Sequence, residues 1–140
     1  MSPSPITVLA FDFGTLRIGV AYGQSLTQTA KPLKELTANN GIPQWEHIQA
    51  LIDEWQPSCF LTGLPLNMDG SENAMCQRAR KFSQRLHGRF GLPSYLWDER
   101  LSSHEVKIDN PSDNYKRDAV DSLAAVSIVE SWFYNKTPKS

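Results

Sequence analysis

The chain has 140 residues and a formal net charge of −1, from 14 Lys and Arg residues against 15 Asp and Glu residues. This length fits one domain, and a hydrophobic content of 40% argues against an intrinsically disordered chain. The near-zero charge argues against a protein that coats nucleic acid through bulk positive charge, and no apolar run approaches the roughly 20 residues of a membrane span.

The N-terminal segment and the two cysteines indicate the cellular compartment of the protein. No basic segment precedes an apolar core at the N-terminus, so we expect no secretory signal. Cys59 and Cys76 are too few and too widely spaced for a zinc pattern, and we interpret them as reduced structural thiols. These features predict a cytoplasmic protein that has no membrane partner.

The first part of the chain is typical of an antiparallel meander. Ile6–Phe13 and Ile18–Tyr22 are strand-like runs separated by a short turn, and Gln28–Leu33 is a weaker third strand. Because side chains alternate across a strand, Asp12 ends one of the two apolar rows of the first strand.

The rest of the chain alternates between helices and strands. Apolar residues recur at helical spacing from Trp45 to Trp55, with Pro43 suited to the first helical turn and Pro57 as a stop. A strand, a helix and a strand in that order favour a parallel crossover. We therefore predict an α/β fold with a mixed five-stranded sheet, three strands antiparallel and two parallel, flanked by helices. The remaining expected elements are a buried strand, a helix, a short strand and a final helix, over Ser58–Leu64, Ser71–Leu86, Pro93–Trp97 and Asp118–Tyr134.

Acidic residues stand at the ends of three of these elements. Asp12 ends the first strand, Asp98 and Glu99 follow the last strand, and Asp121 lies in the first turn of the final helix. Each acid alone fits a structural role, such as a turn, an ion pair or a helix N-terminus. Together they can converge on one crevice, where carboxylates repel one another unless a divalent cation neutralises them. The pattern predicts a Mg²⁺ or Mn²⁺ site of the kind that activates water for phosphodiester cleavage.

Five stretches resemble the YqgF/RuvX family, in family order. The resemblance covers about residues 5–134 and implies one RNase H-like domain over residues 1–140, similar to the Holliday-junction resolvase RuvC. The family is generally described as a nuclease of the 16S ribosomal RNA precursor that acts in maturation of its 5′ end, and it has also been called a Holliday junction resolvase. The stretches are FDFGTLRIGVAYG (11–23), GLPLNMDG (63–70), RARKFSQRL (78–86), DERLSS (98–103) and VDSLAAV (120–126).

This resemblance also implies roles for individual acids. Asp12, Glu99 and Asp121 match the three acids of the family and would act as catalytic metal ligands. Asp98 is a rival to Glu99, because neighbours in a strand point to different faces. Asp118 is a candidate for a second helical carboxylate, although the segment before it departs from the family pattern, in which basic residues precede this position.

Basic residues gather in one part of the chain. The stretch Asn73–Trp97 contains no Asp or Glu, and Arg78, Lys81 and Arg85 share one helical stripe that Arg89 would extend. This stripe is either a solvated helix face or a track for nucleic-acid phosphates.

Two further arginines lie beside the candidate acids in the sequence. Arg17 belongs to the hairpin that follows Asp12, and Arg100 follows Glu99. Both are candidates to position a scissile phosphate, while Arg100 has the alternative role of holding Asp98 or an acid of the last helix in place.

The leading functional prediction is a Mg²⁺- or Mn²⁺-dependent endonuclease acting on structured RNA such as an rRNA precursor, as a monomer or weak homodimer. Cleavage of branched DNA uses the same site and normally needs a dimer. A third hypothesis is nucleotide binding, because residues 12–15 (DFGT) also resemble the phosphate-binding hairpin of the actin, Hsp70 and sugar-kinase superfamily. A last alternative is a non-catalytic RNA-binding or ribosome-assembly module.

Overall fold

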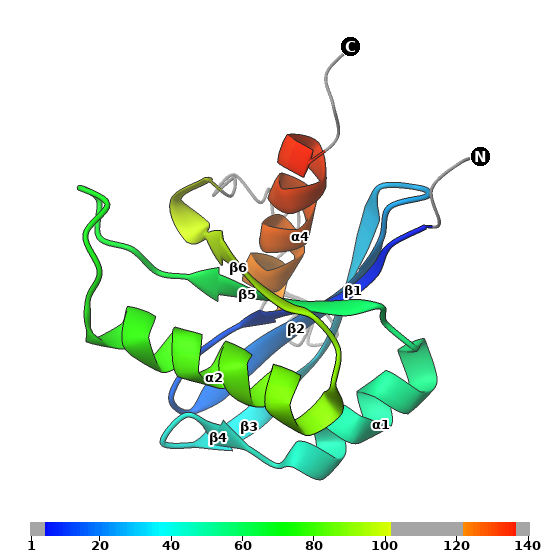
Figure 1. Ribbon diagram of the computed structural model, residues 1–140, viewed down its shortest axis with the longest axis horizontal. Coiled ribbons are helices and arrows are strands. Elements are labelled where there is room, and N and C mark those ends of the chain that lie inside the picture. The colour runs from blue at the N-terminus through cyan, green and yellow to red at the C-terminus, as the bar shows by residue number, and fades with distance from the viewer. Residues whose placement is uncertain (1–4, 102–121, 137–140) are drawn as a thin grey trace, which may run out of the picture.

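A single six-stranded sheet forms the centre of the molecule in the computed structural model, which describes residues 5–101 and 122–136 (Figure 1). Its strand order is β4-β3-β2-β1-β5-β6. The first three strands form an antiparallel meander, while β5 and β6 run parallel to β1. The strands are β1 (Thr7–Asp12), β2 (Arg17–Gln24), β3 (Thr29–Asn39), β4 (Ile42–Pro43), β5 (Cys59–Leu64) and β6 (Ser94–Asp98).

This sheet confirms the predicted mixed topology and adds one short edge strand. The third strand continues to Asn39, where a turn with left-handed Asn40 and Gly41 (φ 53° and 82°) reverses the chain. Pro43 then pairs with Ala38 in β4, so the prediction that it opens a helix was wrong. Proline tolerates this place because an edge strand leaves one side without ladder hydrogen bonds.

Helices cover both faces of the sheet (Figure 1). On one face, α4 (Leu123–Lys136) buries Ile128 and Val129 against the strands. On the other face lie α1 (Trp45–Trp55) and α2 (Ala74–Phe90), whose Ile48 and Phe82 pack on the alternate strand residues. The sheet therefore has two separate apolar layers, and neighbouring residues of one strand enter different layers.

The ends of these elements position the chain around the candidate acids. The Asn73 side chain accepts a hydrogen bond from the Cys76 N–H at 3.0 Å, so α2 begins at Ala74, three residues later than predicted from the sequence. Left-handed Gly91 ends this helix. Strand β6 ends at Asp98, and a 3₁₀ turn, η1 (Glu99–Leu101), follows it.

Two simpler expectations concern the thiols and membranes. Cys59 and Cys76 are both buried and form no disulfide, as predicted. Within the two described ranges, no helix has the length and apolar character needed to cross a bilayer. The cytoplasmic location stays a prediction.

Candidate active site

The C-terminal ends of three parallel strands bring two of the predicted acids together. Asp12 is the last residue of β1, and Glu99 opens η1 directly after β6. Strand β5 lies between β1 and β6, so Glu99 must reach across it to meet Asp12. The two side chains are hydrogen-bonded to each other.

Gly63 of β5 makes this reach possible. A Cβ atom at this position would lie 2.5 Å from Glu99 Oε1 and 2.5 Å from Ile128 Cδ1 of α4, closer than real side chains approach. The missing side chain leaves a slot on the α4 face of β5 that the Glu99 carboxyl group fills. A glycine inside a buried strand commonly marks such a close approach.

The electrostatics of this pair favour a bound cation. Burial raises the pKa of Glu99 to about 8, helped by the hydrogen bond to Asp12 and by repulsion from Asp12 and Asp98. Glu99 therefore keeps its proton near neutral pH, because a buried carboxyl beside another acid resists ionising. A divalent cation would replace that proton and keep both groups ionised.

Asp98 has a different partner. Its carboxylate accepts hydrogen bonds from Arg100 at both oxygens, with Nη2 to Oδ2 at 2.8 Å and Nε to Oδ1 at 3.1 Å. Hydrogen bonding and attraction to this guanidinium lower the pKa of Asp98. The structure thus places Glu99, and not Asp98, against Asp12, and it pairs Arg100 with Asp98, which is one of the two roles predicted for this arginine.

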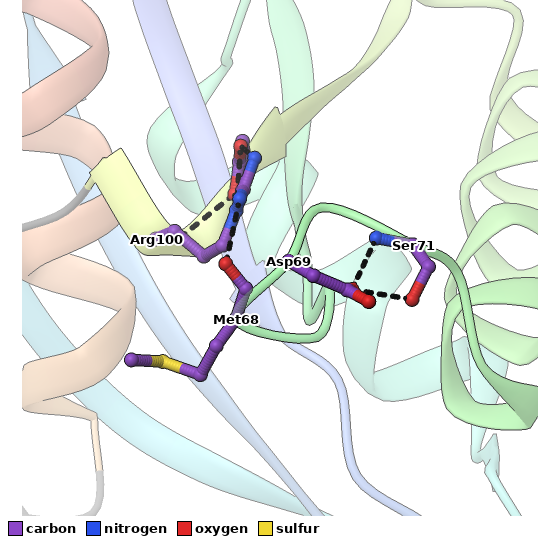
Figure 2. Close-up of polar contacts among 5 residues, drawn as sticks. Met68, Asp69, Ser71 and Arg100 are labelled. Atoms are coloured by element: carbon purple, nitrogen blue, oxygen red, sulfur yellow. Dashed lines mark hydrogen bonds and ion pairs between the residues drawn. The ribbon is translucent and has the colours of Figure 1, made fainter.

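Arg100 also holds the loop between β5 and α2. Figure 2 shows its guanidinium beside this loop, where Nη1 donates to the Met68 carbonyl oxygen at 3.2 Å. Asp69 caps the same loop by accepting from the N–H of Ser71 at 2.9 Å and from its hydroxyl at 2.6 Å. These Ser71 hydrogen bonds lower the pKa of Asp69. One arginine therefore ties the strand-end turn to a second loop at the same edge.

The third predicted acid, Asp121, and its candidate companion Asp118 lie outside the described residues. The next residue along, Ser122, is fully buried and fastens the start of α4 to the sheet. Its hydroxyl donates to the Leu33 carbonyl at 2.6 Å and accepts from the Val20 N–H at 3.1 Å. The Val20 N–H is free to do this because the β2–β3 pairing shifts register between Ile18 and Val20.

The predicted basic residues fall into two groups. Arg17 is exposed, and its Nη1 atom forms an ion pair with Glu35 Oε1 at 3.6 Å. Arg78, Lys81 and Arg85 line one pocket between α2 and the turn from β3 to β4, as their shared stripe predicted.

Arg89 does not extend that stripe. Its guanidinium lies over the Trp45 ring at 4.3 Å, which is a cation–π contact on the α1 side of the helix. Arg80 pairs with Glu72 through two hydrogen bonds of 2.9 Å. Both side chains are therefore engaged within the protein.

Two residues of the site were not identified from the sequence. Gly63 lies within the stretch GLPLNMDG and interrupts a buried strand, which is a detectable signal for a close approach. Ser122 follows a candidate acid, but its bridge depends on a register shift in another strand, which no local pattern indicates.

The comparisons with known proteins cover nearly the whole chain. The family model described as "RuvX: Holliday junction resolvase" matches residues 6–135. Two relatives named "Putative pre-16S rRNA nuclease" are 52% identical over 136 residues (Saccharophagus degradans; 94% of this chain, 96% of the relative) and 53% identical over 133 residues (Haemophilus ducreyi; 92% and 96%).

Solved structures agree on the fold. The structure of T. thermophilus RuvC in complex with Holliday junction substrate has a TM-score of 0.57 at 15% identity, covering 94% of this chain and 95% of that one. A Thermus thermophilus RuvC structure has a TM-score of 0.58 at 13% identity. The RNase H-like fold expected from the sequence is therefore confirmed, and the chain belongs to the RuvX family.

Proposed function

We propose that this chain is a divalent-metal-dependent endonuclease that hydrolyses phosphodiester bonds in structured RNA, processing the 5′ end of the 16S rRNA precursor. The observation that carries the proposal is the Asp12–Glu99 pair, which combines oxygen ligands with a strong electrostatic need for a cation. The names of relatives more than half identical over nearly the whole chain support the RNA substrate.

The donor set fits Mg²⁺ or Mn²⁺ once a third acid is added. Within residues 5–101 and 122–136, no three His, Cys, Asp or Glu side chains cluster closely enough to hold a metal. Asp12 and Glu99 would supply two carboxylates, and Asp121, which directly precedes the anchored Ser122, would supply the third. Hard divalent cations prefer such oxygen ligands.

The chemistry divides between the metal and the protein. When bound, the cation would act as a Lewis acid that polarises the scissile phosphate and activates the attacking water. Asp12 and Glu99 hold their carboxylates together across Gly63, while Arg100 keeps Asp98 turned to its own guanidinium. Arg17 is exposed at the start of β2, just after the Asp12 loop, and would approach a substrate phosphate by exchanging its ion pair with Glu35.

The test is cleavage of a 5′-extended 16S rRNA precursor fragment in Mg²⁺ or Mn²⁺. Asp12→Asn and Glu99→Gln should each lose at least about a hundredfold in rate, since even residues behind a metal ligand cost 10- to 100-fold. Asp98→Asn is the matched control, because its carboxylate binds Arg100, and it should lose much less. Full cleavage by Asp12→Asn would refute this pair of acids as the active site, and no cleavage by the wild type in either metal would favour the non-catalytic RNA-binding alternative.

Cleavage of branched DNA is the second candidate, favoured by the description of the family model. A symmetric junction needs two active sites, and hence a dimer, whereas processing of one RNA strand works with a monomer. Sedimentation with a four-way DNA junction separates the two: a single protomer per junction at saturating protein, without cleavage, argues against resolution.

A further inference from the structure

A basic pocket lies on the opposite face of the sheet from the paired acids. It has a volume of about 210 Å³ and sits between α2 and the turn that joins β3 to β4. Arg78, Lys81 and Arg85 of α2 line one side, and Asn40 and Gly41 of the turn line the other. None of the described residues that line it is acidic.

The pocket is built by specific contacts. Arg78 Nη1 donates to Asn40 Oδ1 at 3.1 Å, which joins the helix to the turn. A Cβ atom at Gly41 would lie 2.8 Å from the Phe13 ring, so this left-handed glycine lets the turn close on that ring. The Gly41 N–H also donates to the Thr15 carbonyl at 2.8 Å. The turn is thereby fixed against the loop that follows Asp12.

The charges in this pocket are available to a ligand. Lys81 and Arg85 are exposed and make no ion pair within the described residues, whereas Arg80 and Arg89 on the same helix are engaged by Glu72 and Trp45. The three pocket cations extend from Arg78 to Arg85, seven steps along the helix axis, or about 10 Å. Such a row suits an extended anion with repeated charges.

The size of the pocket argues against a free small molecule. Pockets for drug-sized ligands measure about 300–1,000 Å³, and this one is smaller. One unit of a polymer needs a less enclosed pocket than a free molecule does, because other contacts along the polymer also hold it in place.

Strand alternation fixes the relation between the pocket and the acids. Asp12 follows Val8 and Ala10 on the α4 face, whereas the next residue, Phe13, packs on Phe82 of α2 with ring centroids 5.4 Å apart. A ligand that touches both sites must therefore pass around the sheet edge where β1 ends.

We propose that this basic pocket binds the sugar-phosphate backbone of the nucleic-acid substrate away from the scissile bond, so that the substrate bends around the end of β1. This proposal rests on the proposed function for the identity of the ligand. It gives the enzyme a preference for bent or branched strands over straight duplexes, because only they reach both faces.

The test measures binding without cleavage, in the Asp12→Asn background. Fluorescence anisotropy follows binding of an RNA hairpin with single-stranded tails, a DNA hairpin of the same sequence and a straight RNA duplex, between about 50 and 200 mM salt. The pocket variant is Lys81→Gln/Arg85→Gln. The control is Arg80→Gln/Arg89→Gln, which removes the same charge from the same helix outside the pocket.

The pocket variant should bind the tailed RNA about tenfold more weakly, and its slope of log K against log salt should fall by about 1.4 to 1.8, the contribution of two phosphates. The control and the straight duplex should change little. The two hairpins show whether the site prefers RNA or DNA. If circular dichroism shows abnormal melting of the double variant, Lys81→Gln alone replaces it. This single variant should give half the change in slope.

Two outcomes overturn the proposal: equal affinity and slope in the pocket variant and its parent, or equal losses in the pocket and control variants. The second would show a diffuse charge effect. Failure of the proposed function is a separate observation, since it appears as no metal-dependent cleavage by the wild type or as undiminished cleavage by Asp12→Asn, while the binding measurements need no cleavage.

Discussion

The two faces of the sheet at the end of β1 have opposite electrostatic character. On the α4 face, Asp12 and Glu99 are hydrogen-bonded to each other, and burial raises the pKa of Glu99. On the α2 face, Lys81 and Arg85 are exposed around a pocket that no described acid lines. The acids lie together where we propose that a cation binds, and the bases where we propose that a polyanion binds.

This contrast explains how a chain with a net charge of −1 can bind nucleic acid. The opposite charges cancel in the sum but lie on different surfaces, separated by the sheet. Binding through a few local phosphate contacts depends on this arrangement and not on the total charge. The two faces can also be perturbed independently, which gives the following predictions.

The largest effect should come from Gly63→Ala, which fills the slot occupied by Glu99. The new methyl group would displace the Glu99 carboxyl or Ile128, so cleavage should fall at least about a hundredfold and stability by about 1–3 kcal/mol. RNA affinity through the basic pocket should persist. Gly88→Ala is the control, because nothing lies within 4 Å of its Cβ position, and it should stabilise α2 by about 0.5–1 kcal/mol. Normal cleavage by Gly63→Ala would mean that Glu99 need not lie over β5.

Ser122→Ala should affect the same face at the start of α4. It leaves a buried Val20 N–H and Leu33 carbonyl without their bridge, at a cost of about 1–3 kcal/mol in chemical denaturation. If the bridge also positions the preceding acid, kcat should fall while KM changes little. Ser127→Ala, at another buried serine of α4, is the comparison. A loss of stability with unaltered kcat would limit Ser122 to a structural role.

The acid face should also make stability depend on pH. The pKa of Glu99 is about 8 in the folded protein against 4.5 for a free carboxyl, so the unfolded chain binds fewer protons between these values. Stability therefore falls as pH rises from about 5 to 8. Thermal melts should show this fall, Glu99→Gln should flatten it, and Mg²⁺ should reduce it. The same dependence of melting temperature on pH in the wild type and in Glu99→Gln would contradict this role of Glu99.

The smallest effect is expected on the α2 face, at Thr62. Its hydroxyl is buried and has no hydrogen-bond partner within the described residues. Thr62→Val keeps the shape and should stabilise the protein by about 1 kcal/mol without altering cleavage. Ser83→Ala should destabilise the protein instead, because the Ser83 hydroxyl is hydrogen-bonded to the Ser94 hydroxyl at 2.7 Å. Destabilisation by Thr62→Val would reveal a partner for this hydroxyl.

Local patterns in the sequence predicted the sheet well. Alternation identified β1 and placed Asp12 on one face with Val8 and Ala10, which the structure shows to be the α4 face, and helical spacing identified the stripe of Arg78, Lys81 and Arg85. Strand β4 and the end of β3 were missed. They depend on left-handed Asn40 and on pairing between neighbouring strands, and Pro43 is equally suited to a first helical turn.

Features that depend on non-local contacts were harder to predict. The choice between Asp98 and Glu99 follows from where β6 ends and from the space over Gly63, which the Glu99 carboxyl group fills. The separation of Arg89 from the other cations follows from the position of Trp45 in another helix. No spacing within one segment contains that information.

The Ser122 bridge has a consequence for the order of folding. Ser122 follows Val20 by 102 positions in the sequence and Leu33 by 89 positions. The chain therefore closes a very long loop before α4 is fastened to β2 and β3. The meander, by contrast, forms from neighbouring segments. Because contacts between distant segments form slowly, we expect the meander to precede the docking of α4. Asp121, the third ligand proposed above, would then join Asp12 and Glu99 only at the end of folding. A partly folded chain would then bind RNA without cutting it.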